Sequence, residues 1–201
     1  MAKIPVILDC DPGADDTLAL MLAYRMEELD LKAITTVAGN VEIEHTFRNG
    51  RNVMAYLGAD VPVYRGAEKP LHKELHTAVH VHGENGMGGM ILEESKAAVE
   101  TEAAWDGMYR IAKAEQGELV LIAIGPLTNL AIAFEKYPDL KEYIKRIIIM
   151  GGAIKGGNVT PHAEFNIFVD PEAAAKVFQC GLPVYMCGLD VTMESYMTRK
   201  E

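Results

Sequence analysis

Short apolar runs alternate with longer segments of helical periodicity along most of this chain, and this alternation most constrains its fold. The apolar runs cover residues 5–8, 31–38, 61–64, 118–125, 145–152 and 182–188. The helical segments cover residues 15–28, 43–58, 103–117, 127–138 and 171–181. Nearly every position in the short runs is apolar, which is typical of parallel strands buried on both faces. We therefore predict an α/β fold: a mostly parallel open sheet with helices on both faces, joined by right-handed crossovers.

The length and composition are those of one domain, and we predict a single α/β domain over residues 1–201. A chain of this length buries roughly 70% of the surface that its unfolded form exposes, so a full core is feasible. Residues 66–100 interrupt the alternation with the sequence HKELHTAVHVHGENGMGG and little regular periodicity. Because long connections inside a domain are usually functional or mobile, we predict an active-site loop region here.

Charge and hydropathy exclude several classes of function. The net charge of −10 argues against nucleic acid and a basic membrane patch, because phosphates need lysine and arginine to replace their counterions. No apolar run approaches the ~20 residues of a membrane span. The apolar run 4–8 meets Asp9 at once, unlike a signal peptide. Three cysteines without a CxxC motif favour a reducing compartment. We expect a cytoplasmic protein that binds neither nucleic acid nor membranes.

The stretch ILDCDPGADD, residues 7–16, concentrates negative charge directly after the first predicted strand. Its four carboxylates are Asp9, Asp11, Asp15 and Asp16. The Pro12-Gly13 pair favours a tight turn, so all four acids gather at the carboxyl end of the strand, where open α/β sheets bind ligands. Clustered carboxylates repel each other unless protons or a cation join them. The stretch therefore predicts a site for a hard cation such as calcium or magnesium.

Other interpretations of this cluster stay open. Asp15 or Asp16 could cap the following helix, or the cluster could be a solvated acidic turn. An EF-hand loop is excluded, because counting from Asp9 places Leu20 where that loop needs glutamate. Phosphatases of the haloacid-dehalogenase type carry DxDxT after their first strand, and here Gly13 replaces the threonine. A magnesium-dependent phosphohydrolase with Asp9 as nucleophile is thus an alternative function.

The same stretch resembles the DxDPGxDD signature of nucleoside hydrolases, the inosine-uridine-preferring family of N-ribohydrolases. Further matching segments follow in order along the chain: AITTVAGN, HGENG, IGPLTNLA, IMGGA and GNVTPHAEFNIFVDPEAA. The resemblance covers essentially the whole chain and implies the Rossmann-like fold of that family. It also implies a homodimer or homotetramer that hydrolyses the N-glycosidic bond of ribonucleosides such as inosine or uridine. The resemblance further implies that the reaction depends on Ca²⁺ and releases ribose and the free base for nucleoside salvage.

The resemblance also assigns roles to individual residues. Asp11 and Asp16 would bind calcium through their carboxylates, and Ile124 through its backbone carbonyl. Asp11 would also be the general base for the attacking water, and Asp9 would support the ligands from behind. Contacts with the nucleoside fall on Asp15, Asn40, His82, Met150, Asn158, Glu164 and Asn166. Amide and carboxylate groups suit ribose hydroxyls, which both donate and accept hydrogen bonds.

The sequence departs from the family pattern towards its end. Family members are longer, and an aspartate near their C-terminus, beside a histidine that helps the base leave, completes the calcium shell. No His-Asp pair follows residue 190 in this chain, and Thr198 and Glu201 have the spacing of a capping box, which opens a helix. We therefore expect the sequence to be the N-terminal portion of a longer nucleoside hydrolase. An inactive fragment that binds nucleosides or acts in assembly is a further alternative.

Overall fold

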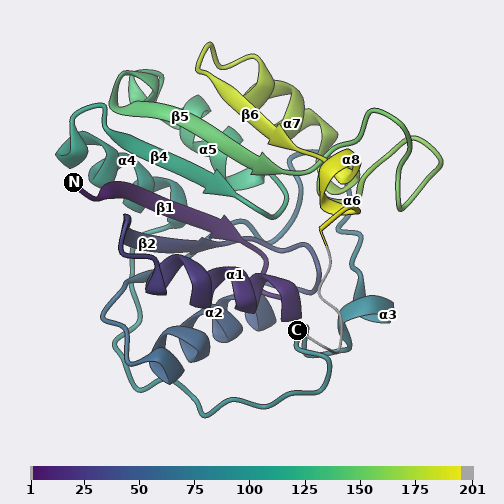
Figure 1. Ribbon diagram of the computed structural model, residues 1–201, viewed down its shortest axis with the longest axis horizontal. Helices are drawn as coiled ribbons and strands as arrows, with labels where there is room; N and C mark the ends of the chain where they lie inside the picture. The colour runs from purple at the N-terminus through teal and green to yellow at the C-terminus, as the bar shows by residue number, and fades with distance from the viewer. Residues whose placement is uncertain (1, 196–201) are drawn as a thin grey trace.

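The computed structural model of the chain describes residues 2–195 and contains a six-stranded, all-parallel sheet with the strand order β3-β2-β1-β4-β5-β6 (Figure 1). The strands are β1 (Ile4–Cys10), β2 (Leu29–Thr36), β3 (Val63–Arg65), β4 (Leu119–Ala123), β5 (Ile144–Met150) and β6 (Val184–Cys187). Each of the six overlaps one of the predicted apolar runs, with ends that differ by up to two residues, so the predicted parallel α/β fold is confirmed. The capping box expected at Thr198 and Glu201 lies outside the described residues.

The long helices also lie where their periodicity predicts them. They are α1 (Ala14–Arg25), α2 (Ile43–Leu57), α4 (Ala104–Glu115), α5 (Thr128–Lys136) and α7 (Pro171–Phe178). The shorter α3 (Val79–His82), α6 (Phe165–Val169), α8 (Leu189–Thr192) and the 3-10 turn η1 (Leu140–Tyr143) were not predicted, because one turn shows no periodicity. None of the helices in residues 2–195 combines the length and the apolar character that a membrane crossing needs.

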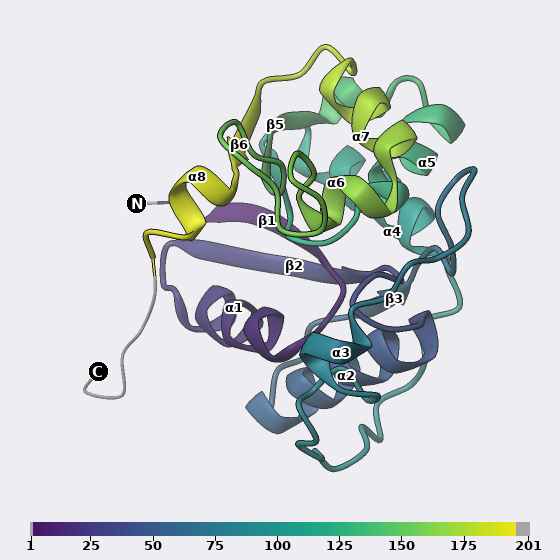
Figure 2. The same cartoon turned by 90° about the vertical axis from the view of Figure 1, so that its right-hand side faces the viewer.

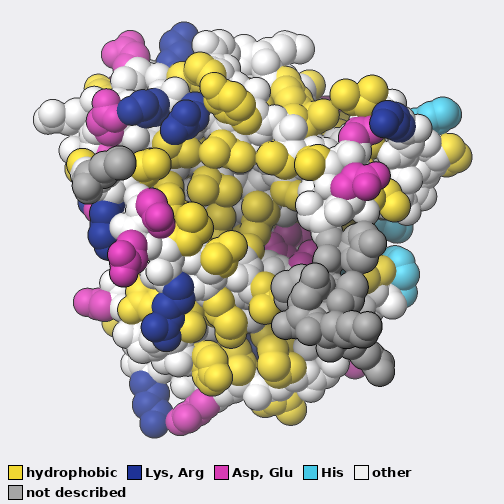
Figure 3. All heavy atoms as spheres, viewed as in Figure 1, with side chains coloured by type: hydrophobic (Ala, Val, Ile, Leu, Met, Phe, Trp, Pro, Cys, Tyr) yellow, Lys and Arg dark blue, Asp and Glu magenta, His cyan; other side chains and the backbone are white. Residues whose placement is uncertain are grey.

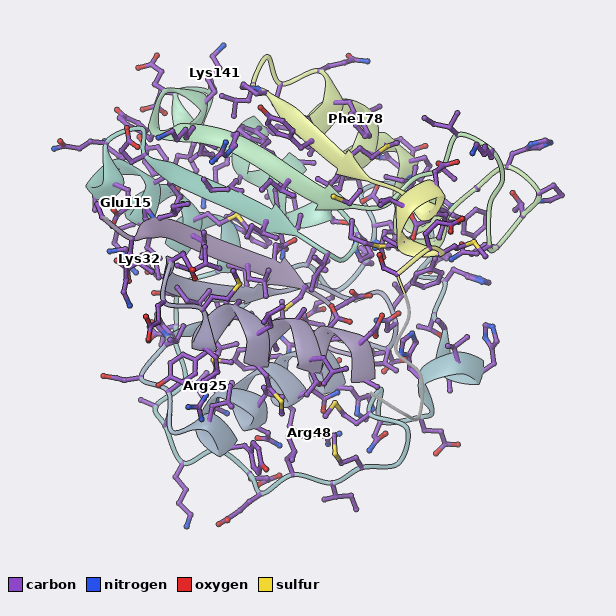
Figure 4. All side chains as sticks on the ribbon, viewed as in Figure 1. Arg25, Lys32, Arg48, Glu115, Lys141 and Phe178 are labelled. Carbon is purple, nitrogen blue, oxygen red and sulfur yellow. The ribbon has the colours of Figure 1, made fainter. Side chains whose placement is uncertain are left out.

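The helices pack on the sheet in two layers with separate cores. Helices α1 and α2 lie against one face over β1, β2 and β3, and α4, α5 and α7 lie against the other (Figures 1 and 2). Neighbouring residues of β1 point to opposite faces: Ile7 belongs to the α4/α5/α7 core, and Leu8 packs with Leu20 of α1 in the α1/α2 core. At the amino end of the sheet, Lys32 forms an ion pair with Glu115 of α4 (3.0 Å; Figure 4).

A buried asparagine in α5 ties β1 and β2 together at their carboxyl ends. The Asn129 side chain is fully buried. Its Nδ2 donates to Asp9 Oδ1 (2.8 Å) and to the Thr36 carbonyl (2.9 Å), and its Oδ1 accepts from the Ala67 backbone N–H (2.8 Å). One amide therefore holds β1, β2 and the start of the long connection after β3 in place.

Replacing this amide should destabilise the fold. We expect Asn129→Ala to lower the free energy of unfolding by about 2–4 kcal/mol, because it leaves several buried polar groups without partners. Urea denaturation followed by circular dichroism measures the change. Lys141→Ala, on the exposed surface of η1 (Figure 4), is the control and should change stability by less than about 0.5 kcal/mol. Equal urea midpoints for the two variants would contradict this role of Asn129.

Candidate active site

In open α/β sheets, ligands generally bind beyond the carboxyl ends of the strands at the point where the strand order reverses. In this sheet that point lies between β1 and β4. Asp11 follows β1, Asn40 follows β2, and Ile124 follows β4 directly. These residues face a cavity of about 460 Å³. The predicted site residues that line it are Asp11, Asp15, Asp16, Asn40, His82, Ile124, Met150, Asn158, Glu164 and Asn166. Residues far apart in the sequence thus meet at one edge of the sheet.

Asp9 is the one predicted site residue that does not line the cavity. It lies inside β1, paired with Thr35 and Ala123 of the neighbouring strands, and its side chain is 1% exposed. Its Oδ1 accepts from Thr35 Oγ1 (2.6 Å) and Asn129 Nδ2 (2.8 Å). Asp9 therefore sits behind the cavity, with its carboxylate held away from any ligand in it.

The carboxylate of Asp11 lies between two glycines that make room for it. It is 1% exposed, and its Oδ2 accepts from the Asn40 backbone N–H (2.7 Å). A Cβ atom on Gly39 would lie 2.2 Å from Asp11 Oδ2, and a Cβ on Gly125 would lie 2.6 Å from Oδ1. Any larger residue at either position would therefore displace this carboxylate.

Asp16 is the second buried carboxylate of the cavity. Its Oδ2 accepts from the Gly13 backbone N–H (3.0 Å) and from Asn40 Nδ2 (3.2 Å). The first of these bonds closes the first turn of α1, so Asp16 has the capping role that one interpretation expected. Its Oδ1 is buried and has no hydrogen-bond partner among residues 2–195. Because Asn40 Nδ2 also donates to the Asp11 carbonyl (3.0 Å), one amide bridges both acidic residues.

Burial makes the charges of these acids costly. It raises the pKa of Asp16 to about 7, and the negative charge of Asp15 adds to the effect. Burial also raises the pKa of Asp11 well above its usual range, with the charge of Asp16 as the second cause. For Asp9, burial raises the pKa to about 7 despite its two hydrogen bonds. The folded chain therefore needs protons or a cation at this edge of the sheet.

The donor set fits a hard divalent cation. Two carboxylates and the Ile124 carbonyl offer oxygen, the ligand type of calcium and magnesium. The Ile124 carbonyl oxygen accepts a hydrogen bond from Asn166 Nδ2 (2.9 Å). This bond uses one of the two lone pairs of the oxygen and leaves the other for a cation. Residues 2–195 contain no group of three or more histidine, cysteine, aspartate or glutamate side chains arranged to hold a metal. The protein ligands found here are therefore fewer than the 6–8 oxygens that calcium takes.

Part of the predicted loop region packs directly on the acidic turn. The Ala78 backbone N–H donates to the Asn40 carbonyl (2.9 Å). His82 Nδ1 lies 3.8 Å from Asp15 Oδ1. A Cβ atom on Gly13 would lie only 2.6 Å from His82 Nδ1. Asp15 itself is exposed, with 80% of its side chain accessible. Residues 76–82 therefore form one wall of the cavity.

Asn49 of α2, which the sequence did not single out, joins this loop to the acidic turn. Its side chain is buried, and Nδ2 donates to the Pro12 carbonyl (3.1 Å) and to the Asn85 carbonyl (2.8 Å). Its signal in the sequence is a polar residue on the buried face of an amphipathic helix. The later part of the predicted loop region, residues 91–100, contributes nothing to the cavity lining.

On the opposite wall, α6 and the loop before it position the remaining predicted residues. Glu164 is 2% exposed, and its Oε2 accepts from the Gly152 (2.9 Å) and Ile167 (3.2 Å) backbone N–H groups. Asn166 Nδ2 donates to the Met150 carbonyl (3.0 Å) as well as to Ile124. These bonds fix both side chains at the cavity rim.

Two more contacts shape this loop. Asn158 is exposed, and its Oδ1 accepts from the Phe165 backbone N–H (2.9 Å). Asp190, in α8, accepts from the backbone N–H groups of Ile154 (2.7 Å) and Lys155 (3.1 Å). Sequence reasoning missed Asp190, because its partners lie more than thirty residues earlier in the chain.

The sequence matches the family described as inosine-uridine preferring nucleoside hydrolase over residues 6–201, and the chain belongs to this family. It is 47% identical over 190 residues to the non-specific ribonucleoside hydrolase RihC of Klebsiella pneumoniae subsp. pneumoniae, covering 94% of this chain and 62% of that protein. It is 48% identical over 190 residues to the pyrimidine-specific ribonucleoside hydrolase RihA of Citrobacter koseri, covering 94% and 61%.

Solved structures show the same relationship. The purine-preferring ribonucleoside hydrolase from Gardnerella vaginalis superposes with a TM-score of 0.94 and 39% identity, covering 98% of this chain and 64% of that chain. The Rossmann-like nucleoside hydrolase fold predicted from the motifs is therefore confirmed. The chain spans 61–64% of the length of these relatives.

The buried acids predict how the stability of the metal-free protein depends on pH. The pKa values of Asp9 and Asp16 are about 7 when folded and about 3.9 when unfolded. The folded state thus binds more protons between these values, so stability falls as pH rises through that window. We expect the free energy of unfolding, measured with urea in excess EGTA, to be lower at pH 8 than at pH 5. Asp9→Asn should weaken this dependence on pH. A free energy of unfolding that rises from pH 5 to pH 8 would contradict the raised pKa values.

Proposed function

We propose that this chain acts in the hydrolysis of the N-glycosidic bond of ribonucleosides, giving ribose and a free base. The observation that carries the proposal is the pair of buried carboxylates, Asp11 and Asp16, in a cavity rimmed by amide and acid side chains. The relatives named above are ribonucleoside hydrolases, which supports it. A homo-oligomer in the cytoplasm belongs to the same proposal, with the three free cysteines in keeping with a reducing compartment.

We propose Ca²⁺ as the cofactor, held by the carboxylates of Asp11 and Asp16 and by the Ile124 carbonyl. When bound, the cation would offset the buried negative charge and make water at the site more acidic. The partnerless Oδ1 of Asp16 supports this assignment, because a buried carboxylate oxygen without a donor is otherwise unfavourable. Asp9, behind the cavity, holds β1 in the position from which Asp11 extends.

The side chains around the cavity have distinct proposed tasks. Asp11 accepts the proton of the attacking water as general base, and the neighbouring carboxylates stabilise the positive charge that develops on the sugar. Both amide hydrogens of Asn40 are committed to Asp11 and Asp16, so its contact with a ribose hydroxyl falls on Oδ1 as acceptor. The other proposed sugar contacts are Asp15, Met150, Asn158, Glu164 and Asn166. His82 would line the pocket for the base.

The base preference is open within this proposal. The relatives are named as non-specific, pyrimidine-specific and purine-preferring, so similarity does not select one base. The phosphohydrolase alternative finds no support, because Asp9, which would be its nucleophile, is 1% exposed and does not line the cavity. A chain that binds nucleosides without cleaving them is the remaining alternative, and the next experiment separates it.

Hydrolysis is tested with a panel of purine and pyrimidine ribonucleosides in the presence of calcium. We expect Asp11→Asn to lower kcat/KM by a factor of about 10²–10⁴, the usual contribution of general acid–base catalysis, with unchanged circular dichroism. Asp60→Asn, at an exposed carboxylate, is the matched control and should keep full activity. Nucleoside binding by calorimetry with no release of base would identify a binding protein. Full turnover by Asp11→Asn would refute Asp11 as the base.

The glycine before Asn40 provides a separate test of the cation site. In Gly39→Ala, the new Cβ would lie 2.2 Å from Asp11 Oδ2, so the carboxylate must move. We expect calcium affinity, measured by isothermal titration calorimetry, to fall by about 10–100-fold, as for other changes that misplace a metal ligand. In the control Gly156→Ala, the atom nearest to the new Cβ is the Pro161 carbonyl oxygen, 3.8 Å away, and calcium affinity should not change. Equal affinities would exclude Asp11 as a ligand.

A further inference from the structure

The loop between β5 and α6, residues 151–164, carries two of the proposed sugar contacts, Asn158 and Glu164. We call this segment the sugar loop. Helix α8 lies beside it (Figures 1 and 2), and acidic side chains reach the surface over α8 (Figure 3). Because α8 contributes no residue to the cavity lining, any effect of α8 on a ligand must pass through the sugar loop.

The carboxylate of Asp190 in α8 binds two successive backbone amides of the sugar loop. Its Oδ2 accepts from the Ile154 N–H (2.7 Å), and its Oδ1 accepts from the Lys155 N–H (3.1 Å). The bond from Ile154 is the main reason that the pKa of Asp190 lies below its usual value, and hydrogen bonds to a charged acceptor are the stronger kind. The side chains of Ile154 and Lys155 are exposed, so Asp190 rather than side-chain packing holds this part of the loop.

The rest of the sugar loop bonds mainly to itself. The Asn158 backbone N–H donates to the Ala163 carbonyl (3.1 Å), and the Ala163 N–H donates to Thr160 Oγ1 (2.9 Å). Of the hydrogen bonds that residues 153–163 form within the described part of the chain, only the two to Asp190 reach an element other than the adjacent α6. Asp190 therefore fixes this turn relative to the sheet.

Gly152 connects the junction between β6 and α8 to Glu164. Its carbonyl accepts from the backbone N–H of Leu189 (2.9 Å), the residue before Asp190, and its own N–H donates to Glu164 Oε2 (2.9 Å). Gly152 has a φ of +78°, and a Cβ atom there would lie 2.9 Å from Met186 Sδ. The junction therefore sets the position of the backbone amide that holds the Glu164 carboxylate at the cavity rim.

We propose that Asp190 is a positioning residue for sugar binding: by holding the backbone of residues 154–155, it keeps Asn158 and Glu164 where they can bind the ribose hydroxyls. This inference rests on the proposed function, because it takes these two side chains as sugar contacts. A misplacement of about 1 Å in such a group can cost an enzyme about 10²-fold. The proposed calcium ligands belong to other segments of the chain, so loss of Asp190 should weaken sugar binding and leave calcium binding unchanged.

The test measures binding of D-ribose, the proposed product, by NMR titration at saturating calcium. We expect Asp190→Ala to weaken ribose binding at least about tenfold, because the sugar loop shifts when its amides lose their acceptor. Asp190→Asn keeps one accepting oxygen and should weaken binding less. Asp60→Ala, at an exposed carboxylate, is the control and should bind ribose normally. Unchanged ribose binding by Asp190→Ala, or an equal loss of calcium affinity in isothermal titration calorimetry, would overturn the proposal.

Two further readouts separate positioning from a general loss of structure. In hydrolysis of ribonucleosides, Asp190→Ala should raise KM at least about tenfold with little change in kcat, because a weakened sugar contact acts on binding. A partly unfolded protein would lose kcat instead. Hydrogen exchange of the Ile154 and Lys155 amides should be faster in Asp190→Ala than in the unaltered chain. A fall in kcat with KM unchanged, or unchanged exchange at these two amides, would also overturn the proposal.

Ribose binding does not require hydrolysis, so the two proposals fail in different ways. Ribose binding that Asp190→Ala retains in full would refute this inference and leave the proposed function intact. An unaltered chain that binds neither nucleosides nor ribose would refute the proposed function, and the role of Asp190 with it.

Discussion

The burial of three aspartates at the carboxyl end of β1 is the constraint on which the rest of this structure depends. Asp9, Asp11 and Asp16 are all at most 4% exposed, and burial raises the pKa of each. Two asparagines make this arrangement possible: Asn129 holds Asp9 from behind the sheet, and Asn40 bridges Asp11 and Asp16 at the cavity. Fold and candidate site therefore share the same polar network, and the fold is held in a form that favours a bound cation.

The parallel sheet explains why residues so distant in sequence serve one cavity. Every strand ends at the same edge, and the reversal of strand order between β1 and β4 leaves an opening there. The loops at this edge are then fixed individually: Asn49 holds the connection after β3, and Asp190 holds the loop after β5. A rigid scaffold with locally anchored loops is a common basis for binding sites in α/β proteins.

The sequence by itself determined the strand and helix order, because apolar runs and helical periodicity are local patterns, and it determined the acidic turn, because that motif is contiguous. The family and the Rossmann-like fold followed from those motifs. Only the tertiary structure decided which carboxylates share the cavity. Asp9 lies inside β1, where Thr35 of β2 and Asn129 of α5 bind its carboxylate, whereas Asp11 follows the end of the strand. The roles of Asn49, Asn129 and Asp190 were likewise invisible in the sequence, since each depends on partners brought together by long-range packing. Short helices such as α3 and α6 escaped prediction for the same reason, because tertiary contacts rather than periodicity stabilise a single turn.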